Sequence, residues 1–276
     1  MIDAHFHSWQ LSRGDYGWLT PAVGVIYRDV AVPDWQKLAA PLGITGGILV
    51  QAAPTVAETL HLLALADTNP TVLGVVGWVD FTATDAVLKI EQLAKNPRFK
   101  GLRPMLHDLP DPAWILQPAV QPALAAMEKL GLVLDALIRP VHLQNILTTA
   151  QRYPNLAIVI DHCAKPAIAH GVDAAWQPWA DGMAALAALP NMSCKLSGLL
   201  TEAGESSEPI ICKPWIDYVL KVFGSEHIIW GSDWPVLELA GAYQTWFEIC
   251  QQYTKHLPIL QRDNIFSNHA QQIYKL

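Results

Sequence analysis

The sequence predicts an α/β fold of the (β/α)8 barrel class, with residues 1–276 forming one domain. Short runs rich in valine, isoleucine and leucine, bounded by glycine or proline, alternate with longer stretches of helical periodicity. Successive runs mostly begin about 25–35 residues apart, the length of one strand, one helix and two loops. Eight such units account for a chain of 276 residues, and no Ser/Gly-rich or charge-rich linker interrupts them.

In chain order, the expected strands read MIDAHFH, GGILVQ, VLGVVGWVD, FKGLRP, LVLDALI, AIVIDHC, MSCKLSG and HIIWGSD. They occupy residues 1–7, 46–51, 72–80, 99–104, 132–138, 157–163, 192–198 and 227–233. The expected helices cover residues 55–68, 84–96, 117–130, 140–153, 175–189, 209–223 and 238–253, with a last helix near 264–276. An open doubly wound sheet is the alternative fold, but no GxGxxG sequence follows any strand, which removes its usual dinucleotide signature.

Composition excludes several classes of protein. Hydrophobic residues make up 51% of the chain and charged residues 16%, which excludes disordered, collagen-like and coiled-coil chains. The formal net charge is −7 and lysines and arginines do not cluster, so we expect no nucleic-acid or membrane partner. The first ten residues do not resemble a signal peptide, and the longest nearly apolar run, 72–79, is far shorter than the roughly 20 residues of a membrane helix.

We therefore expect a cytoplasmic protein. The four cysteines have no CxxC spacing and are expected to be buried thiols rather than metal ligands. A homodimer formed through exposed apolar helices is compatible with the composition, although the sequence identifies no surface for it.

Alternation along the strands brings polar side chains together. In the first strand, Ile2, Ala4 and Phe6 are expected to face the helices, while Asp3, His5 and His7 face the barrel axis. Barrel enzymes place their chemistry at the C-terminal ends of the strands. The polar residues expected near the ends of the other strands are Gln51, Trp78, Asp80, Arg103, Asp135, His162, Lys195, Ser197 and Asp233.

Some of these positions have a second interpretation. Asp135 and Ser197 could equally be polar groups satisfied within the core, as could Gln51 and Asp80. The direction of His162 is ambiguous, because Asp161 precedes it in a strand that is buried on both faces. Tryptophan is more often a core residue than a sugar platform, but Trp18 and Trp78 lie next to the expected site in sequence and could stack on a sugar ring.

Three histidines and one aspartate form a possible metal site. Two imidazoles on one face of a strand, His5 and His7, can share one cation. His162 and Asp233 are available from later strands, and three nitrogens with one carboxylate oxygen suit one divalent metal, zinc best of all. The other histidines lie on expected helices, in a loop or at a strand start, and are not expected to be ligands.

The motifs IDAHFH, GLRPMLHD, VIDHCAKP, SCKLSG and IIWGSDWP resemble the amidohydrolase superfamily. With the segment SWQLSRGDYGWL, the set resembles its sugar-lactonase group, which includes L-fucono- and L-rhamnono-lactonases. The resemblance spans nearly the entire chain. It implies a distorted (β/α)8 barrel that hydrolyses the ester of a cyclic lactone.

The resemblance also implies roles for particular residues. The metal-site positions of the family fall on His5, His7, His162 and Asp233, and substrate contacts fall on Arg103, His107 and Lys165. Binuclear members carry a bridging lysine on the fourth strand and a further histidine on the fifth, where this chain reads FKGLRP and LVLDALI. We therefore expect at most one metal. Some lactonases of this group work without one, so the resemblance leaves metal-independent catalysis open.

The expected mechanism is hydrolysis by an activated water. Asp233 is the candidate general base, with His162 as the second catalytic residue. Arg103, His107, His162 and Lys195 could take up the charge that develops on the carbonyl oxygen. The remaining contacts with substrate are expected from Gln51, Lys165, Trp18 and Trp78. Bound zinc would lower the pKa of water or polarise the carbonyl.

The same residues are compatible with three other functions. Arg103, Lys165 and Lys195 could instead hold an anionic lactone of the muconolactone type. A zinc-dependent decarboxylase of the same superfamily would use a similar set of histidines and an aspartate. A non-catalytic sugar-binding barrel has the least support, because acid–base and metal-type residues are all retained.

Overall fold

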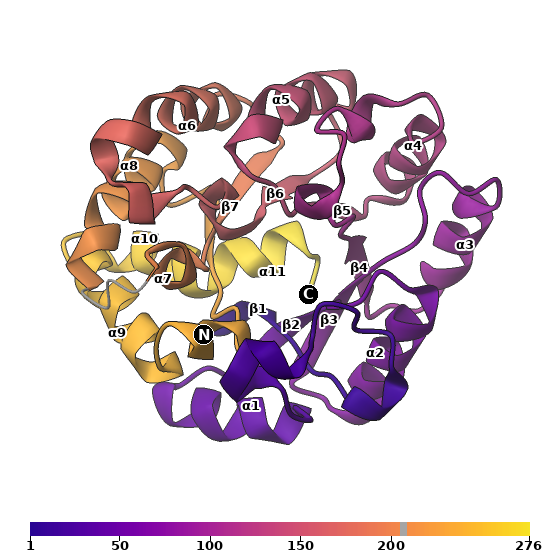
Figure 1. The fold of residues 1–276 in the computed structure, drawn as a ribbon, viewed down its shortest axis with the longest axis horizontal. Coiled ribbons are helices and arrows are strands. Elements are labelled where there is room, and N and C mark those ends of the chain that lie inside the picture. The colour runs from indigo at the N-terminus through magenta and orange to yellow at the C-terminus, as the bar shows by residue number, and fades with distance from the viewer. Residues whose placement is uncertain (205–208) are drawn as a thin grey trace.

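Eight parallel strands form the centre of the molecule (Figure 1). The structure is a computed structural model that describes residues 1–204 and 209–276. Each strand pairs with the next one along the chain, in the order β1 to β8. The strands are β1 (Ile2–Phe6), β2 (Gly46–Val50), β3 (Val72–Gly77), β4 (Phe99–Leu102), β5 (Val133–Ala136), β6 (Ile158–Ile160), β7 (Met192–Leu196) and β8 (Ile228–Trp230). The predicted (β/α)8 barrel is confirmed.

The barrel closes through residues that follow β8 rather than through a regular ladder. His7 N donates to Trp234 O at 2.8 Å, and Asp233 N donates to His5 O at 2.8 Å. Gly231 passes so close to β1 that an added Cβ would lie 2.8 Å from the Cβ of His5. This irregular closure is the distortion of the barrel, and it sets Asp233 directly beside the two histidines of β1.

Strand β1 does not follow the expected alternation. Its register against β2 shifts between Asp3 and Phe6, as at a β-bulge. Ile2 and Ala4, expected to face the helices, instead pack in an inner apolar cluster with valines and isoleucines of the other strands. Asp3, expected to face the axis, accepts hydrogen bonds from Trp35 Nε1 at 2.9 Å and from Tyr243 OH at 2.8 Å, both on outer helices.

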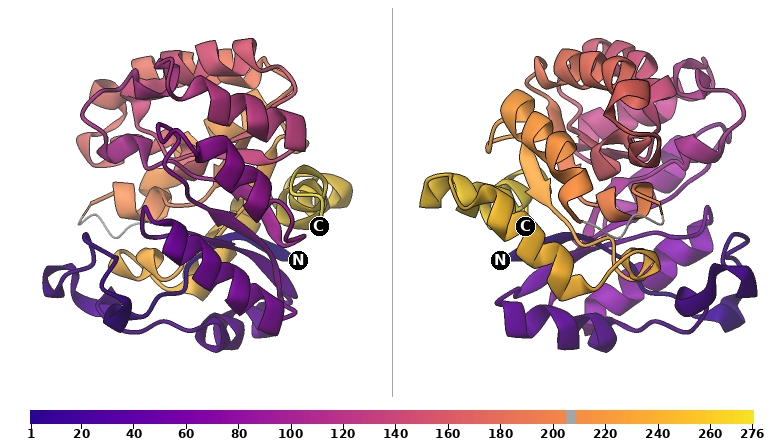
Figure 2. Two further views of the ribbon diagram at one scale, coloured as in Figure 1. Left: turned by 90° about the vertical axis from the view of Figure 1, so that its right-hand side faces the viewer. Right: turned by 60° about the vertical axis from the view of Figure 1, so that its left-hand side comes forward.

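Helices surround the strands (Figures 1 and 2). They are α1 (Val32–Ala39), α2 (Val56–Thr68), α3 (Ala86–Leu93), α4 (Gln121–Leu130), α5 (Leu143–Arg152), α6 (Val172–Ala187), α7 (Leu199–Glu202), α8 (Lys213–Phe223), α9 (Tyr243–Thr254), α10 (Ile259–Asp263) and α11 (His269–Ile273). The short helix α1 was not expected; it begins at a Val-Pro pair and buries Val32, Trp35 and Ala39. The last helix, expected near 264–276, begins earlier, at Ile259, and contains a π-helical turn over Asn264–Asn268.

The C-terminal helices cover the end of the barrel where the strands begin. Figure 2 shows the yellow segment across this end, with the start of β1 beside it. Ala270, Ile273 and Tyr274 pack against the inner apolar cluster. The barrel interior at this end is therefore a packed core.

Candidate active site

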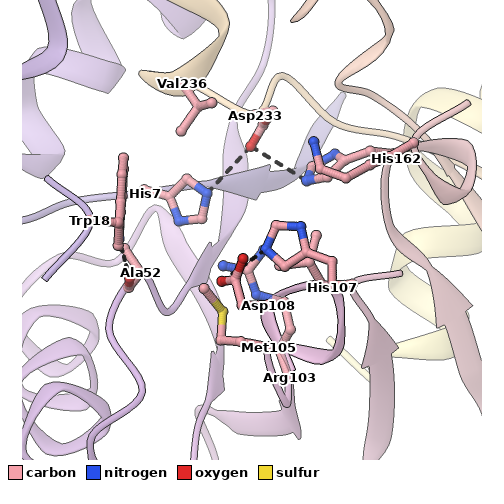
Figure 3. Close-up of a pocket in the computed structure, with 12 residues that line it drawn as sticks. His7, Trp18, Ala52, Arg103, Met105, His107, Asp108, His162, Asp233 and Val236 are labelled. Carbon is pink, nitrogen blue, oxygen red and sulfur yellow. Dashed lines mark hydrogen bonds and ion pairs between the residues drawn. The ribbon is translucent and has the colours of Figure 1, made fainter. Parts of the chain in front are cut away.

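A cavity of about 220 Å³ opens at the C-terminal ends of the strands (Figure 3). It has room for one small ring rather than for an extended polymer. The residues that line it are His7, Trp18, Ala52, Arg103, Met105, His107, Asp108, Leu137, His162, Lys165, Asp233 and Val236. Seven residues predicted for the site are among them, on segments far apart in sequence.

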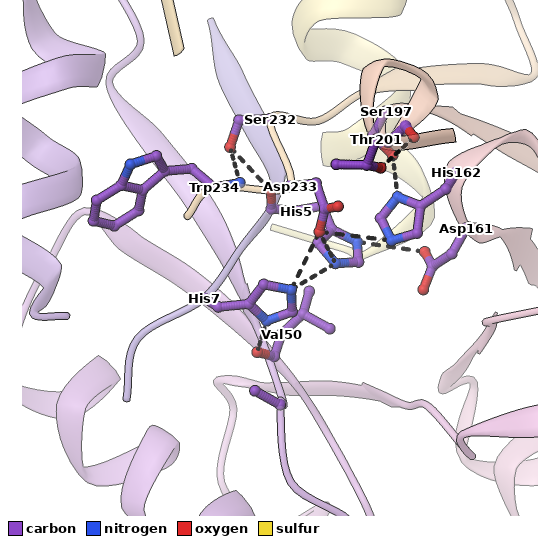
Figure 4. A network of polar contacts seen from close by, with 12 residues as sticks. His5, His7, Val50, Asp161, His162, Ser197, Thr201, Ser232, Asp233 and Trp234 are labelled. Carbon is purple, nitrogen blue, oxygen red and sulfur yellow. Dashed lines mark hydrogen bonds and ion pairs between the residues drawn. The ribbon is translucent and has the colours of Figure 1, made fainter. Parts of the chain in front are cut away.

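His5, His7 and Asp233 form a compact group of donor atoms (Figure 4). Nε2 of His5 lies 3.2 Å from Nε2 of His7, and Asp233 Oδ1 lies 3.6 and 3.3 Å from these two nitrogens. Ligands placed about 2.0–2.2 Å from a tetrahedral zinc ion are about 3.3–3.6 Å from one another. The spacing of the three donors therefore fits a divalent cation, with one position left for water or substrate.

The surroundings orient this group. His7 Nδ1 lies 2.8 Å from Val50 O, so a proton on Nδ1 is donated there and Nε2 keeps its lone pair for the donor group. Burial lowers the pKa of His5 well below its usual value. Burial opposes the charge on Asp233, but the neighbouring imidazoles outweigh it and hold the pKa below its usual value. Neutral imidazole and ionised carboxylate are the forms that bind metal.

His162 follows β6 in an unusual backbone conformation. Residues His162 to Lys165 all have positive φ, between 46° and 62°, although none is glycine. The turn directs His162 into the cavity, where its Nε2 lies 3.6 Å from Asp233 Oδ1 and its Nδ1 lies 2.8 Å from Ser197 Oγ. Burial lowers the pKa of His162 to about 4. His162, expected to be a fourth ligand, falls within a second donor group with His5 and Asp161 rather than within the first.

Lys195 lies beneath the cavity rather than on its wall. Its side chain is fully buried, forms an ion pair with Asp135, and lies 3.0 Å from Asp161 Oδ1. Asp135 also accepts a hydrogen bond from Tyr274 OH at 2.8 Å. This position gives no support to the predicted contact between Lys195 and substrate, because two buried carboxylates enclose the ammonium.

Asp161 was not among the site residues predicted from the sequence, although it directly precedes His162. Its carboxylate lies 3.4 Å from His5 Nδ1 and 3.5 Å from Arg103 Nη1. The nearby cations outweigh the effect of burial and hold its pKa well below the usual value. Asp161 could have been identified from the sequence as a site residue, because it lies next to His162 at the end of an expected buried strand.

Gln51 and Arg103 connect the ends of β2 and β4. Gln51 Nε2 donates to Arg103 O at 2.8 Å, and Arg103 Nη2 donates to Gln51 O. Gln51 is fully buried and does not line the cavity, so its position gives no support to the predicted contact with substrate. Arg103 reaches the cavity, where its Nη1 lies 3.3 Å from His5 Nε2.

The outer wall contains the predicted Trp18, His107 and Lys165. Trp18 Nε1 donates to Ala52 O at 2.7 Å. His107 Nε2 lies 3.2 Å from an Asp108 carboxylate oxygen, and burial lowers the pKa of His107 to about 4. Lys165 forms an ion pair with Glu202, a residue that the sequence did not identify.

A second cavity, of about 580 Å³, adjoins the first, and Trp18, Met105 and Asp108 line both. Trp78 and Asp80 line only this second cavity. The predicted contact between Trp78 and a ring bound beside Asp233 is therefore not supported by its position.

Glu58 supports the wall from behind and was also missed. It is fully buried at the start of α2, and its carboxylate accepts hydrogen bonds from Ala52 N at 3.0 Å and from Ala53 N. Thr55 Oγ1 accepts from Glu58 N at 3.0 Å, which caps the helix. Burial raises the pKa of Glu58 to about 7. The carboxyl group thus holds the loop that carries Ala52, the acceptor for Trp18.

Residues 2–276 match the amidohydrolase family model, Amidohydro_2. The chain belongs to the amidohydrolase family. This amidohydrolase is 43% identical to an L-fucono-1,5-lactonase from Burkholderia ambifaria, over 100% of the chain and 95% of the relative. It is 30% identical to an L-fucono-1,5-lactonase from Burkholderia multivorans, over 100% of the chain and 96% of the relative. A crystal structure of an amidohydrolase from Burkholderia multivorans with bound zinc superposes with a TM-score of 0.93, at 30% identity, over 100% and 99% of the two chains.

Among the described residues of this amidohydrolase, none of the helices combines the length and apolar character needed to cross a membrane. The cytoplasmic location, the homodimer and the assignment of residues 1–276 to one domain stay predictions.

Proposed function

We propose that the protein opens a sugar lactone, with L-fucono-1,5-lactone as the first candidate, and releases the aldonic acid. The observation that carries this proposal is the position of Asp233. Its carboxylate lies at the wall of a cavity for one small ring, within 3.3–3.6 Å of three imidazoles. The names of the two full-length relatives, both L-fucono-1,5-lactonases, support the same activity.

Asp233 is the proposed general base. Its carboxylate accepts a proton from the attacking water as the water oxygen bonds to the carbonyl carbon. The ring C–O bond then breaks, and the same proton passes to the ring oxygen that leaves. A carboxylate with a lowered pKa is a weak base. Hydrolysis of an ester in a strained ring needs less activation of the water than hydrolysis of an amide, so a weak base is sufficient.

His162 and Arg103 are the proposed donors to the carbonyl oxygen. When Nδ1 of His162 accepts the hydroxyl proton of Ser197, Nε2 carries the other proton toward the cavity. Arg103 lies on the wall near His5. Hydrogen-bond donors fixed in advance around the oxygen that gains charge lower the barrier of acyl transfer.

We propose that His5, His7 and Asp233 hold one divalent cation, with zinc the best match to two nitrogens and one oxygen. When bound, such a cation supplies a Lewis acid for the carbonyl and a lower pKa for water. Zinc bound in the structurally similar amidohydrolase supports this assignment.

The charges around the cavity favour a neutral sugar lactone over an anionic one. Each of the two cationic side chains on the wall has a carboxylate partner: Lys165 pairs with Glu202, and Arg103 lies 3.5 Å from Asp161. Burial lowers the pKa of His107 to about 4, so this ring is neutral at pH 7. The carboxylate of an anionic lactone would have to displace these internal partners, whereas sugar hydroxyls can share them.

A pH-indicator assay over a panel of lactones tests the proposal. L-fucono-1,5-lactone, L-rhamnono-lactone and a muconolactone are compared, with spontaneous hydrolysis subtracted, before and after removal of metal by chelation and after zinc is restored. We expect the highest kcat/KM on a sugar lactone. Turnover confined to muconolactone would overturn the sugar assignment, and release of carbon dioxide from an aromatic acid would favour a decarboxylase.

A further inference from the structure

A second group of possible metal donors lies on the other side of the His5 ring. His5, Asp161 and His162 are all buried, and one donor atom from each lies within 4.8 Å of the others. Nε2 of His5 faces His7 and Asp233, whereas its Nδ1 lies 3.4 Å from Asp161 Oδ1. The two groups therefore share one imidazole, through opposite ring nitrogens.

The ammonium of Lys195 is placed among the donors of this second group. Nζ lies 3.0 Å from Asp161 Oδ1 and 3.3 Å from His5 Nδ1, and it also pairs with Asp135. Lys195 reaches this position from β7, which pairs directly with β6, the strand before Asp161. Its side chain is fully buried, so water does not screen its charge.

Arg103 adds a second fixed positive charge. Its Nη1 lies 3.5 Å from the other oxygen of Asp161, and its side chain is 4% exposed. Lys195 and Arg103 thus partly balance the charges of Asp135 and Asp161, whereas, among the described basic side chains, Asp233 faces only imidazoles within 4 Å. A divalent ion at the second group would face the Lys195 ammonium at short range in a water-poor interior, where repulsion is strong. Arg103 Nη1 also lies 3.3 Å from His5 Nε2 in the first group, so Lys195 is the charge that distinguishes the two groups.

We propose that the Lys195 ammonium occupies the second donor group in place of a metal ion, so that the centre accepts a divalent cation only at His5, His7 and Asp233. Removal of this ammonium opens a second cation site at His5, Asp161 and His162. An ion bound there displaces the Nδ1 proton of His5 to solvent, so that the imidazolate ring bridges the two ions. The proposal concerns the number and position of bound metal ions and does not depend on which lactone is hydrolysed.

Zinc counting tests it. Metal-free wild type, Lys195→Ala and the charge-conserving Lys195→Arg are dialysed against zinc chloride, and zinc per chain is measured by inductively coupled plasma mass spectrometry. We expect Lys195→Ala to bind one more zinc ion than wild type and Lys195→Arg to bind the same number as wild type. Because Lys195→Ala leaves two buried carboxylates without their partner, Lys195→Ala with Asp135→Asn is measured in parallel, with the same expected gain.

The position of the zinc is read from anomalous scattering of zinc-soaked crystals. We expect the additional peak of the alanine variant between His5 Nδ1, Asp161 and His162. Equal zinc counts in wild type and folded Lys195→Ala, or an additional peak elsewhere, would overturn the proposal. A peak at the second group in wild type would do the same, and this observation requires no variant to fold. Because none of these measurements uses turnover, they are independent of the lactonase assignment.

Discussion

Ser197 Oγ lies 2.8 Å from Nδ1 of His162. The hydroxyl comes directly after β7, and the imidazole comes from the turn after β6. Through this contact one strand end fixes the ring orientation of a catalytic candidate on its neighbour. Partners of this kind also select which ring nitrogen carries the proton.

Replacement of Ser197 by alanine is expected to lower kcat by about 10-fold or more, because a hydrogen-bond partner that orients a site histidine typically contributes that much to activity. Ser193→Ala is the matched control, since Ser193 lies on β7, shortly before Ser197, and its hydroxyl contacts His269 at 2.9 Å, away from the cavity. Steady-state kinetics on the best sugar lactone measures both variants. An equal loss in the two would show that Ser197 acts only on stability.

Gly198 is the next residue and leaves no space for a side chain. Its φ is +65°, and a Cβ there would lie 2.7 Å from Cβ and Cγ of His162. Gly198→Ala is therefore expected to lower both stability and kcat. Gly14→Ala is the control, because Gly14 has a φ of +70° with nothing near its Cβ, and it should cost only the backbone strain of roughly 1–2 kcal/mol. Similar urea unfolding curves and unchanged kinetics for both variants would contradict the steric role.

Asp233→Asn tests the general base. We expect kcat to fall by about 10²–10⁴-fold, the range for loss of acid–base catalysis. The backbone should be retained, since Asp233 has a φ of 60° and asparagine tolerates this conformation well. Circular dichroism and thermal melting check the fold. The control Asp80→Asn changes a carboxylate of the neighbouring cavity and should leave kcat unchanged. Full activity in Asp233→Asn would show that Asp233 is not the general base.

Glu58 gives a pH-dependent prediction. Burial raises its pKa from 4.5 to about 7, so its contribution to stability is full below pH 4.5 and is lost as pH rises through 7. Glu58→Gln removes this dependence. The free energy of unfolding of the variant minus that of wild type should increase between pH 4.5 and pH 8, by on the order of 3 kcal/mol. Urea titrations at several pH values measure it, and a difference that stays constant would show that the carboxyl does not titrate in this range.

Alternation along strands predicted much of the site, because it decides which face a side chain occupies. On β7 it correctly placed Lys195 and Ser197 on the same, inward face. Alternation does not give depth along the barrel, however. Lys195 lies one layer below Ser197, where Asp135 and Asp161 enclose it, so the expected contact with substrate could not be distinguished from a buried ion pair.

Two local irregularities of the backbone, in β1 and in the turn after β6, could not be predicted from the sequence pattern. The register shift in β1 turned Asp3 outward and Ala4 inward, because one extra residue in a strand reverses its faces. The turn from His162 to Lys165 relies on consecutive positive φ values in residues that rarely adopt them. Tertiary contacts, including those of His162 with Ser197, stabilise this turn, and no short-range preference encodes them.

The irregular closure of the barrel also determines at which stage of translation the active site can be completed. Of the eight barrel strands, β1 is made first, and one of its edges pairs with β2 soon afterwards. The other edge of β1 can form its hydrogen bonds only with Asp233 and Trp234, which leave the ribosome more than two hundred residues later. A nascent chain that stalls before this point therefore carries His5 and His7 without their carboxylate, so the earliest-made part of the active site is also the last to be completed.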